Sequence, residues 1–192
     1  MHESNNLYLV LLGCKPPGRH TEQHDIFLGI GKSLGELAPK FKAFWPEAPR
    51  IHIDAWREIH SVDGYSIKVV PRGNGQEMAG SEKNKKLFLI NLGGYQENKF
   101  EEQHYLVLTV QENKAEAGKL ARDTVFFRQN QFNGALSHID DQYGIEVDDV
   151  YEIEDLLNPE WKKQFSIVLK PEKDLAEDPF HLGYLKLSDL EV

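Results

Sequence analysis

The sequence of 192 residues contains a single cysteine, Cys14. No internal disulfide can form, which suits a reducing compartment without requiring one. No apolar run approaches the roughly eighteen residues that a membrane helix needs. The first residues also lack the basic and apolar regions of a signal peptide. We therefore expect a soluble, cytoplasmic protein.

Positive charge is also scarce. The chain has 22 Lys and Arg against 31 Asp and Glu, a formal net charge of −9. The densest basic stretch, Lys83-Asn84-Lys85-Lys86, is typical of a solvated linker. Nucleic acids and anionic membranes require a positive surface, so the composition argues against both as partners. The partner stays unknown, and a homodimer is left open.

One segment of the chain recurs. Leu7–Ile30 aligns without a gap with Leu87–Val110, at an offset of eighty residues. The positions with identical residues are Leu7, Leu9, Leu12, Gly13, Glu22, Gln23, His24 and Leu28. We interpret the chain as a tandem duplication. The predicted parts are a first repeat (1–72), a linker (73–85), a second repeat (86–170) and a C-terminal tail (171–192), which could add a strand to a sheet.

Each repeat is predicted to begin with two strands. Leu7–Leu12 is an apolar run closed by Gly13, which is typical of a buried strand. Glu22–Ile30 is compatible with a strand or a helix. Its second copy, His104–Val110, is rich in residues that favour strands, so we expect a strand in both places.

A helix is predicted next in each repeat. Ser33 with Glu36, and Asn113 with Glu116, have the spacing of an N-terminal capping box. The expected apolar stripes comprise Leu34, Leu37, Phe41 and Phe44 in the first helix, and Ala117, Leu120, Ala121, Thr124 and Phe127 in the second. Pro39 should shorten or kink the first helix, and Pro46 should end it.

After the helices the repeats realign at an offset of eighty-six residues, where His52-Ile53-Asp54 meets His138-Ile139-Asp140. On this alignment Ile59, Asp63, Tyr65 and Ile67 meet Ile145, Asp149, Tyr151 and Ile153. Ile51–Trp56 and Tyr65–Val70 are predicted strands. Gln164–Leu169 and Phe180–Leu187 are predicted strands too, and the former could pair with an open edge in the first repeat.

The predicted fold class is α+β. Each half is expected to run strand–strand–helix–strand–strand, with the helix across one face of a mixed or antiparallel sheet. This order of elements is similar to that of a β-grasp, or ubiquitin-like, roll. The two halves are expected to pack as an internal pseudo-dimer, because each half is small for a stable domain.

Histidines and carboxylates form the main candidate site. Glu22, Gln23, His24, His52 and Asp54 are the first set, and Glu102, Gln103, His104, His138 and Asp140 are the second. His52 and Asp54 are two residues apart on a predicted strand, so their side chains should leave the same face. His24, His52 and Asp54 could together bind a divalent metal such as zinc, manganese or iron. No other cofactor is indicated.

Two further roles compete with metal binding. The same groups could carry out general acid–base chemistry, because histidine titrates near neutral pH. Alternatively, His24 shares a strand face with Ile26, Leu28 and Ile30, and a histidine at the end of such a row is more often a hydrogen-bonded structural residue. The sequence favours the structural role.

The His-Thr-Glu-Gln-His-Asp run at 20–25, the His-Ile-Asp-Ala-Trp-Arg-Glu run at 52–58 and the duplication together resemble a small bacterial family, domain of unknown function 1543. Its members carry one or two copies of the domain. The second copy departs from the pattern, since Asp25 becomes Tyr105 and Trp56-Arg57 becomes Gln142-Tyr143. The resemblance implies no activity, ligand or catalytic residue.

No motif in the sequence fixes a reaction. The function expected first is a non-enzymatic binding or assembly module, acting through a groove between the halves or an exposed sheet edge. The second is a metal-dependent or acid–base enzyme that uses Glu22, His24, His52 and Asp54. Whether the chain is an enzyme stays open at this point.

Overall fold

The computed structural model describes residues 4–73, 82, 84–94, 100–122 and 145–190. The chain divides into two compact units: unit 1 comprises Met1–Ser81 and Leu157–Val192, and unit 2 comprises Glu82–Leu156. Both units are α+β, and the strand pairs in the described part of the chain are antiparallel. The predicted second repeat, 86–170, does not coincide with a unit, because residues 157–170 fold with the N-terminal part.

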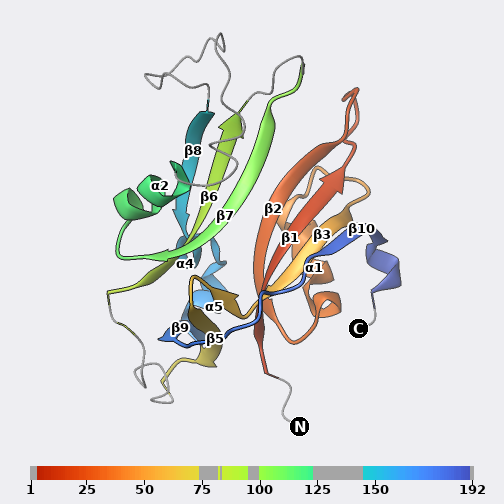
Figure 1. The fold of residues 1–192 in the computed structure, drawn as a ribbon. Coiled ribbons are helices and arrows are strands. Elements are labelled where there is room, and N and C mark those ends of the chain that lie inside the picture. The colour runs from red at the N-terminus through yellow and green to blue at the C-terminus, as the bar shows by residue number, and fades with distance from the viewer. Residues whose placement is uncertain (1–3, 74–81, 83, 95–99, 123–144, 191–192) are drawn as a thin grey trace. The chain divides into compact units, whose positions relative to one another are not determined.

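The main sheet of unit 1 has four strands in the order β10-β3-β1-β2 (Figure 1). They are β1 (Asn6–Cys14), β2 (Gln23–Gly31), β3 (His52–Ile59) and β10 (His181–Lys186). The predicted strands in these regions are therefore present, including the one in the C-terminal tail. A short 3₁₀ helix, η2 (Leu187–Asp189), follows β10.

β2 and β3 run in the same direction on either side of β1, and they are connected through the helix α1 (Leu34–Phe44). This is a split βαβ arrangement, with one antiparallel strand between two parallel ones. The starts of β2 and β3 therefore lie beside the end of β1. The analogy with a β-grasp roll is wrong for this sheet, because that roll needs a parallel strand next to the first strand and both neighbours of β1 are antiparallel.

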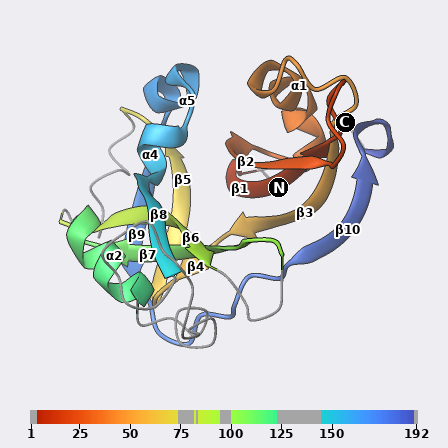
Figure 2. The ribbon, with the colours of Figure 1, turned by 90° about the horizontal axis from the view of Figure 1, so that it is seen from above.

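α1 covers one face of this sheet (Figure 2). The Ser33 side chain accepts a hydrogen bond from the backbone N–H of Glu36, and the Glu36 carboxylate accepts one from the N–H of Lys32 at 2.7 Å. The predicted cap is therefore present. Phe41 is fully buried and meets the Phe27 ring edge-on, with centroids 4.8 Å apart. The helix continues past Pro39 and ends at Phe44.

A second sheet in unit 1 consists of β4 (Ser61–Val62), β5 (Tyr65–Pro71) and β9 (Phe165–Pro171), in the order β4-β5-β9. β5, predicted as the last strand of the first repeat, thus leaves the sheet of β1. The expected pairing of Gln164–Leu169 with an open edge is confirmed, because β9 pairs with β5. The helix α5 (Pro159–Gln164) precedes β9, and its Trp161 meets Phe27 edge-on.

Unit 2 contains a three-stranded sheet in the order β7-β6-β8, formed by β6 (Lys86–Gly94), β7 (Gln103–Gln111) and β8 (Ile145–Glu152). Among the described residues of this unit, the helices are α2 (Lys114–Arg122) and α4 (Ile153–Leu156). The core consists of Phe88, Ile90 and Leu92 of β6 with Ala117 and Ala121 of α2. Leu120 is exposed, and the predicted stripe residues Thr124 and Phe127 lie outside the described residues.

The first hairpins of the two units have matching registers. Leu7 pairs with Ile30 in unit 1, and Leu87 pairs with Val110 in unit 2, an offset of eighty residues. The registers after the helices differ from the sequence alignment. Gly13 lies opposite His52, whereas Gly93 lies opposite Glu146, so the offset is 146 − 52 = 94 and not 86.

The predicted matches of Ile59, Asp63, Tyr65 and Ile67 with Ile145, Asp149, Tyr151 and Ile153 are therefore wrong, because Ile145–Glu152 corresponds to β3. An identity of three residues constrains the alignment of the repeats less than the register of a whole pair of strands does. The predicted site residues His138 and Asp140 lie outside the described residues. In the described part of the chain, no helix is long and apolar enough to cross a membrane.

Candidate functional site

The candidate site lies where β1 ends and β2 and β3 begin. Gly13 of β1 pairs with His24 of β2 on one side and with His52 of β3 on the other. A methyl group on Gly13 would overlap Asp54 Oδ2 and His52 Nε2. The missing side chain at this position therefore makes room for polar groups from both neighbouring strands.

Four side chains converge over this glycine, and we call Glu22, His24, His52 and Asp54 the Gly13 cluster. His52 Nε2 lies 3.0 Å from Glu22 Oε1 and 3.3 Å from Asp54 Oδ1. His24 Nε2 lies 3.2 Å from Asp54 Oδ2 and 3.7 Å from Glu22 Oε2. Each imidazole is thus close to both carboxylates, in a closed ring of alternating acids and bases.

A β-bulge lies at the cluster. In the β1–β3 ladder Leu12 pairs with Ile53 but Leu11 pairs with Ala55, so Asp54 is the extra residue. Bulges are frequent next to functional sites. His52 and Asp54 lie on the same side of the strand, which agrees with the sequence-based expectation.

The two histidines differ in their access to solvent. The His52 side chain is only 10% exposed, and its ring lies 4.4 Å from the exposed ring of Tyr184 of β10, centroid to centroid. The His24 side chain is 45% exposed. A dissolved ligand can therefore reach His24 more easily than His52. Asp54 Oδ2 is buried and makes no hydrogen bond of good geometry within the described part of the chain.

Gln23 does not join the cluster. Its side-chain amide donates to the backbone oxygens of Thr21 and Glu22, at 3.4 and 3.2 Å, and so binds its own loop. Gln103 of unit 2 donates in the same way to the oxygen of Glu101. Both glutamines therefore have local roles in their loops.

Unit 2 repeats part of the arrangement. His104 Nε2 lies 3.7 Å from Glu102 Oε2, the distance found between His24 and Glu22. Gly93 lies opposite His104, as Gly13 lies opposite His24. On the other side of Gly93 the backbone position corresponding to His52 is held by Glu146. Unit 2 therefore has one histidine, not two, at these ladder positions.

The candidate metal ligands His24, His52 and Asp54 are brought together through the shared carboxylate. Across the described residues, however, no group of three or more His, Cys, Asp and Glu side chains is arranged to hold a metal ion. The contacts are ion-pair distances of 3.0–3.7 Å between the imidazole Nε2 atoms and the carboxylate oxygens.

Two contributors were missed at the sequence level. Gly13 recurs as Gly93, and this repeated glycine was a usable signal for a position where side chains approach closely. Tyr184 lies far along the chain, and its alternating strand pattern does not indicate that β10 pairs with β3.

Comparison with known proteins places the cluster within a described domain. Residues 19–69 match the family model Domain of Unknown Function (DUF1543). The predicted resemblance is confirmed over this segment, which contains all four residues of the Gly13 cluster. No curated protein matches the chain.

Among solved structures, a protein Il1583 from Idiomarina loihiensis resembles nearly all of the chain. The TM-score is 0.60 at 22% sequence identity, and the match covers 95% of this chain and 98% of that chain. At this identity the likeness concerns the fold alone. The α+β architecture is therefore shared with a solved protein, and the DUF1543 match adds no activity.

Proposed function

We propose that the Gly13 cluster is an acid–base site in which His24 exchanges a proton with a small ligand. The observation that carries the proposal is the convergence of two imidazoles on the same two carboxylates over a glycine. A purely structural histidine needs one partner, whereas here each Nε2 atom has two carboxylates within 3.7 Å.

Each residue of the cluster has a distinct role in this proposal. In this proposal the ring hydrogen of His24 is on Nε2, the atom that faces the two carboxylates, and Nδ1 is the atom that takes a proton from the ligand. The Asp54 carboxylate, 3.2 Å away, orients the ring and stabilises the imidazolium that forms. His52 is buried and fixes Glu22 and Asp54 from the other side.

The proposal is tested with His24→Gln, Asp54→Asn and the control His20→Gln, which alters an exposed loop histidine. Turnover of activated esters, amides and phosphate esters is measured, together with the unfolding free energy of each variant. We expect the first two variants to lose activity by about 10²–10⁴-fold and to keep their stability. Equal rates for wild type and His24→Gln on every substrate, with a less stable variant, would establish a structural role instead.

A thermal-shift series with Zn²⁺, Mn²⁺ and EDTA distinguishes a metal site from the proposed acid–base site. The acid–base proposal predicts the same melting temperature in all three, because no ion is needed to hold the cluster. A stoichiometric ion that raises the melting temperature in wild type but not in Asp54→Asn would replace this proposal with a metal site.

A binding role, the other function expected from the sequence, is supported by one separate observation. Phe180, Leu182 and Tyr184, on and beside the edge strand β10, are 66%, 79% and 64% exposed. Large exposed apolar side chains beside an open sheet edge are typical of surfaces that bind a partner. We propose a second copy of the chain as the occupant, in a two-fold symmetric pairing.

This pairing predicts a mass in solution that doubles with rising concentration, and Leu182→Asp should abolish the doubling. Leu156→Asp, at an exposed leucine in α4, is the control. A monomeric mass for wild type throughout the micromolar range would contradict the pairing.

We also propose that the two units arose by tandem duplication. The matching hairpin registers, the repeated Gly–His pair and the equal Glu–His distances support this origin. The prediction is that His104→Gln leaves the activity of the Gly13 cluster unchanged, because unit 2 has kept one of its two histidines. An equal loss in His104→Gln and His24→Gln would show that both units contribute.

A further inference from the structure

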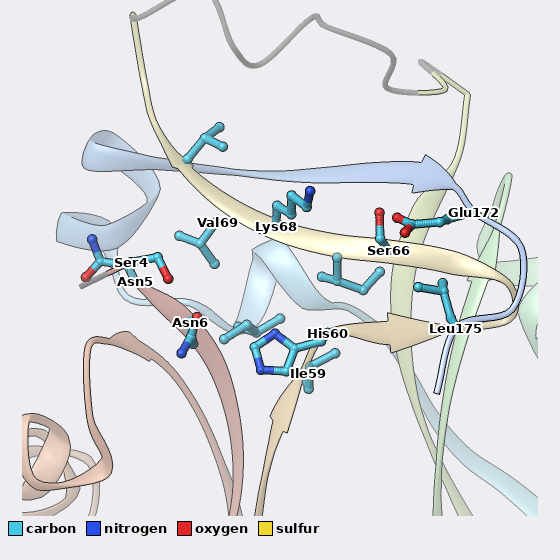
Figure 3. A pocket seen from close by; sticks show the side chains of 13 residues that line it. Ser4, Asn5, Asn6, Ile59, His60, Ser66, Lys68, Val69, Glu172 and Leu175 are labelled. Carbon is cyan, nitrogen blue, oxygen red and sulfur yellow. The ribbon is translucent and has the colours of Figure 1, made fainter. Parts of the chain in front are cut away.

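A cavity lies in unit 1 at the opposite end of the main sheet from the Gly13 cluster. It is bounded by the start of β1, the end of β3 and the length of β5, and its volume is about 420 Å³. Figure 3 shows Asn6, Ile59 and His60 on one side, Lys68 and Val69 along β5 on the other, and Glu172 and Leu175 at one end. Cavities of this size are typical of small-molecule sites.

The floor of the cavity is apolar. Val69, Val70 and Leu175 line it and are partly buried, so they supply the aliphatic surface that a ligand can touch. Leu7, Ile59 and Ile67 form the almost completely buried layer beneath them. An occupant would therefore need an apolar body to displace water from this floor favourably.

One polar group at the cavity, the imidazole of His60, lies within hydrogen-bond distance of a carboxylate. Its Nε2 atom lies 2.9 Å from Glu58 Oε2, which also accepts from the Asn6 amide at 3.3 Å. The other oxygen of Glu58 accepts from the hydroxyl of the buried Tyr8 at 2.9 Å. Because a carboxylate only accepts, Nε2 of His60 carries the hydrogen and Nδ1 is left as an acceptor.

The charges at the rim have opposite signs. Lys68 and Glu172 both line the cavity and are both exposed. The Glu58 carboxylate lies behind His60 and already accepts three hydrogen bonds. A ligand with net charge of either sign would meet a like charge here, and a neutral one would not.

From this geometry we propose that the cavity binds a small neutral molecule with an apolar body and a hydroxyl group, such as an alkylphenol or an alcohol. The body rests on Val69, Val70 and Leu175, next to the buried Ile59 and Ile67, and the hydroxyl donates a hydrogen bond to Nδ1 of His60. This site is independent of the acid–base proposal for the Gly13 cluster, and either could fail without the other.

The experiment uses the full chain with labelled isoleucine methyl groups, followed by NMR. The probe is 4-propylphenol, compared with propylbenzene, which lacks the hydroxyl, and 4-propylbenzoate, which is an anion. We expect the phenol to shift the methyl signals of Ile59 and Ile67 saturably, with the signal of Ile90 in unit 2 unchanged. Weaker binding of both comparison molecules is also expected.

Two variants test the contacts. Val69→Trp fills the cavity and should abolish binding, while His60→Phe keeps a ring but removes the acceptor and should weaken phenol binding several-fold, up to about tenfold. His20→Phe, at an exposed histidine, is the matched control and should bind as wild type does. Because Val69→Trp could also perturb folding, the proposed site is judged on His60→Phe and on the comparison of the three ligands.

The proposal is overturned by any of three results. These are no saturable shift with the phenol, equal affinity for propylbenzene and the phenol, or tighter binding of the benzoate. Equal phenol affinity in His60→Phe and wild type would remove the proposed hydrogen bond and with it the hydroxyl specificity.

Discussion

Gly13 stands directly opposite His52 in the β1–β3 ladder, and a methyl group on Gly13 would overlap the Nε2 atom of His52. The Gly13 cluster therefore requires a residue without a side chain at position 13.

Gly13→Ala should separate the imidazole of His52 from Asp54 and lower the unfolding free energy by about 1–3 kcal/mol, as other overpacking changes do. Urea denaturation measures the effect. Gly118→Ala is the matched control. In α2 the nearest described atom to the new methyl group would belong to Val150, at 4.0 Å. The better helix propensity should stabilise the chain by about 0.5–1 kcal/mol. Equal effects of the two substitutions would contradict the crowding at Gly13.

Tyr8 should make stability depend on pH in the alkaline range. Burial, with the hydrogen bond to Glu58, raises the pKa of Tyr8 far above its ordinary value of about 10. The unfolded chain then loses this proton above about pH 10 while the native state retains it. The unfolding free energy should fall with rising pH there, by up to about 1.4 kcal/mol per pH unit from this residue.

Tyr8→Phe removes this contribution, so the stability difference between wild type and variant should be constant at neutral pH and shrink above about pH 10. Urea melts between pH 7 and 11.5 provide the comparison. Tyr184→Phe, at an exposed tyrosine, should leave the alkaline slope unchanged. A pH-independent difference for Tyr8→Phe would refute the assignment.

Asp178 should be the main attachment of the segment that leads into β10. Its buried carboxylate accepts from the backbone N–H groups of His60 and Ser61, at 2.9 and 3.1 Å, and lies 3.5 Å from Arg57. Burial lowers the pKa of Arg57, and the charge of Asp178 opposes this shift. Asp178→Ala would leave two backbone donors without their acceptor and the mostly buried Arg57 without this carboxylate.

We expect Asp178→Ala to cost about 3–5 kcal/mol of unfolding free energy. Hydrogen exchange of β10 should also become faster, because its attachment is lost. The neighbouring exposed residue provides the control, and Glu177→Ala should cost less than about 1 kcal/mol. Similar losses in the two variants would mean that the buried contacts of Asp178 are not decisive.

The helix caps offer a test of what the sequence predicted locally. Ser33→Ala removes the acceptor for the Glu36 N–H at 3.3 Å, and Asn113→Ala removes that for Glu116 at 3.0 Å. Each change should cost about 0.5–2 kcal/mol in thermal or urea unfolding. Ser33→Asp keeps an acceptor and should restore the stability, so an equal loss in Ser33→Asp and Ser33→Ala would rule out the cap as the cause.

These helix caps show which part of the fold can be predicted from the sequence. A capping box spans four residues, and an apolar run such as Leu7–Leu12 identifies a buried strand without knowledge of its partners. Both features were predicted correctly. The pairing of distant strands was harder to predict. β5 pairs with β9, about a hundred residues away, and β3 pairs with β10. The local periodicity of a sequence does not specify such partners.

The candidate site was partly predictable for the same reason. His52 and Asp54 share a strand, so their common direction followed from geometry. The approach of His24 required the repeat, which singled out the residue, and the split βαβ topology, which brings the starts of β2 and β3 to one end of β1. The alignment with His138 and Asp140 rested on a short sequence identity, without a strand pairing to support it. The strand β8 begins later, at Ile145.

Unit 1 draws its strands from both sides of unit 2 in the sequence. During synthesis β3 and β5 therefore leave the ribosome well before their partners β10 and β9 exist, and both edges stay unpaired while the intervening chain is made. Unpaired strand edges in nascent chains are common sites of aggregation and misassembly. Unit 2, encoded without interruption, can fold first, whereas Tyr184, whose ring lies beside His52, is synthesised only after unit 2 is complete.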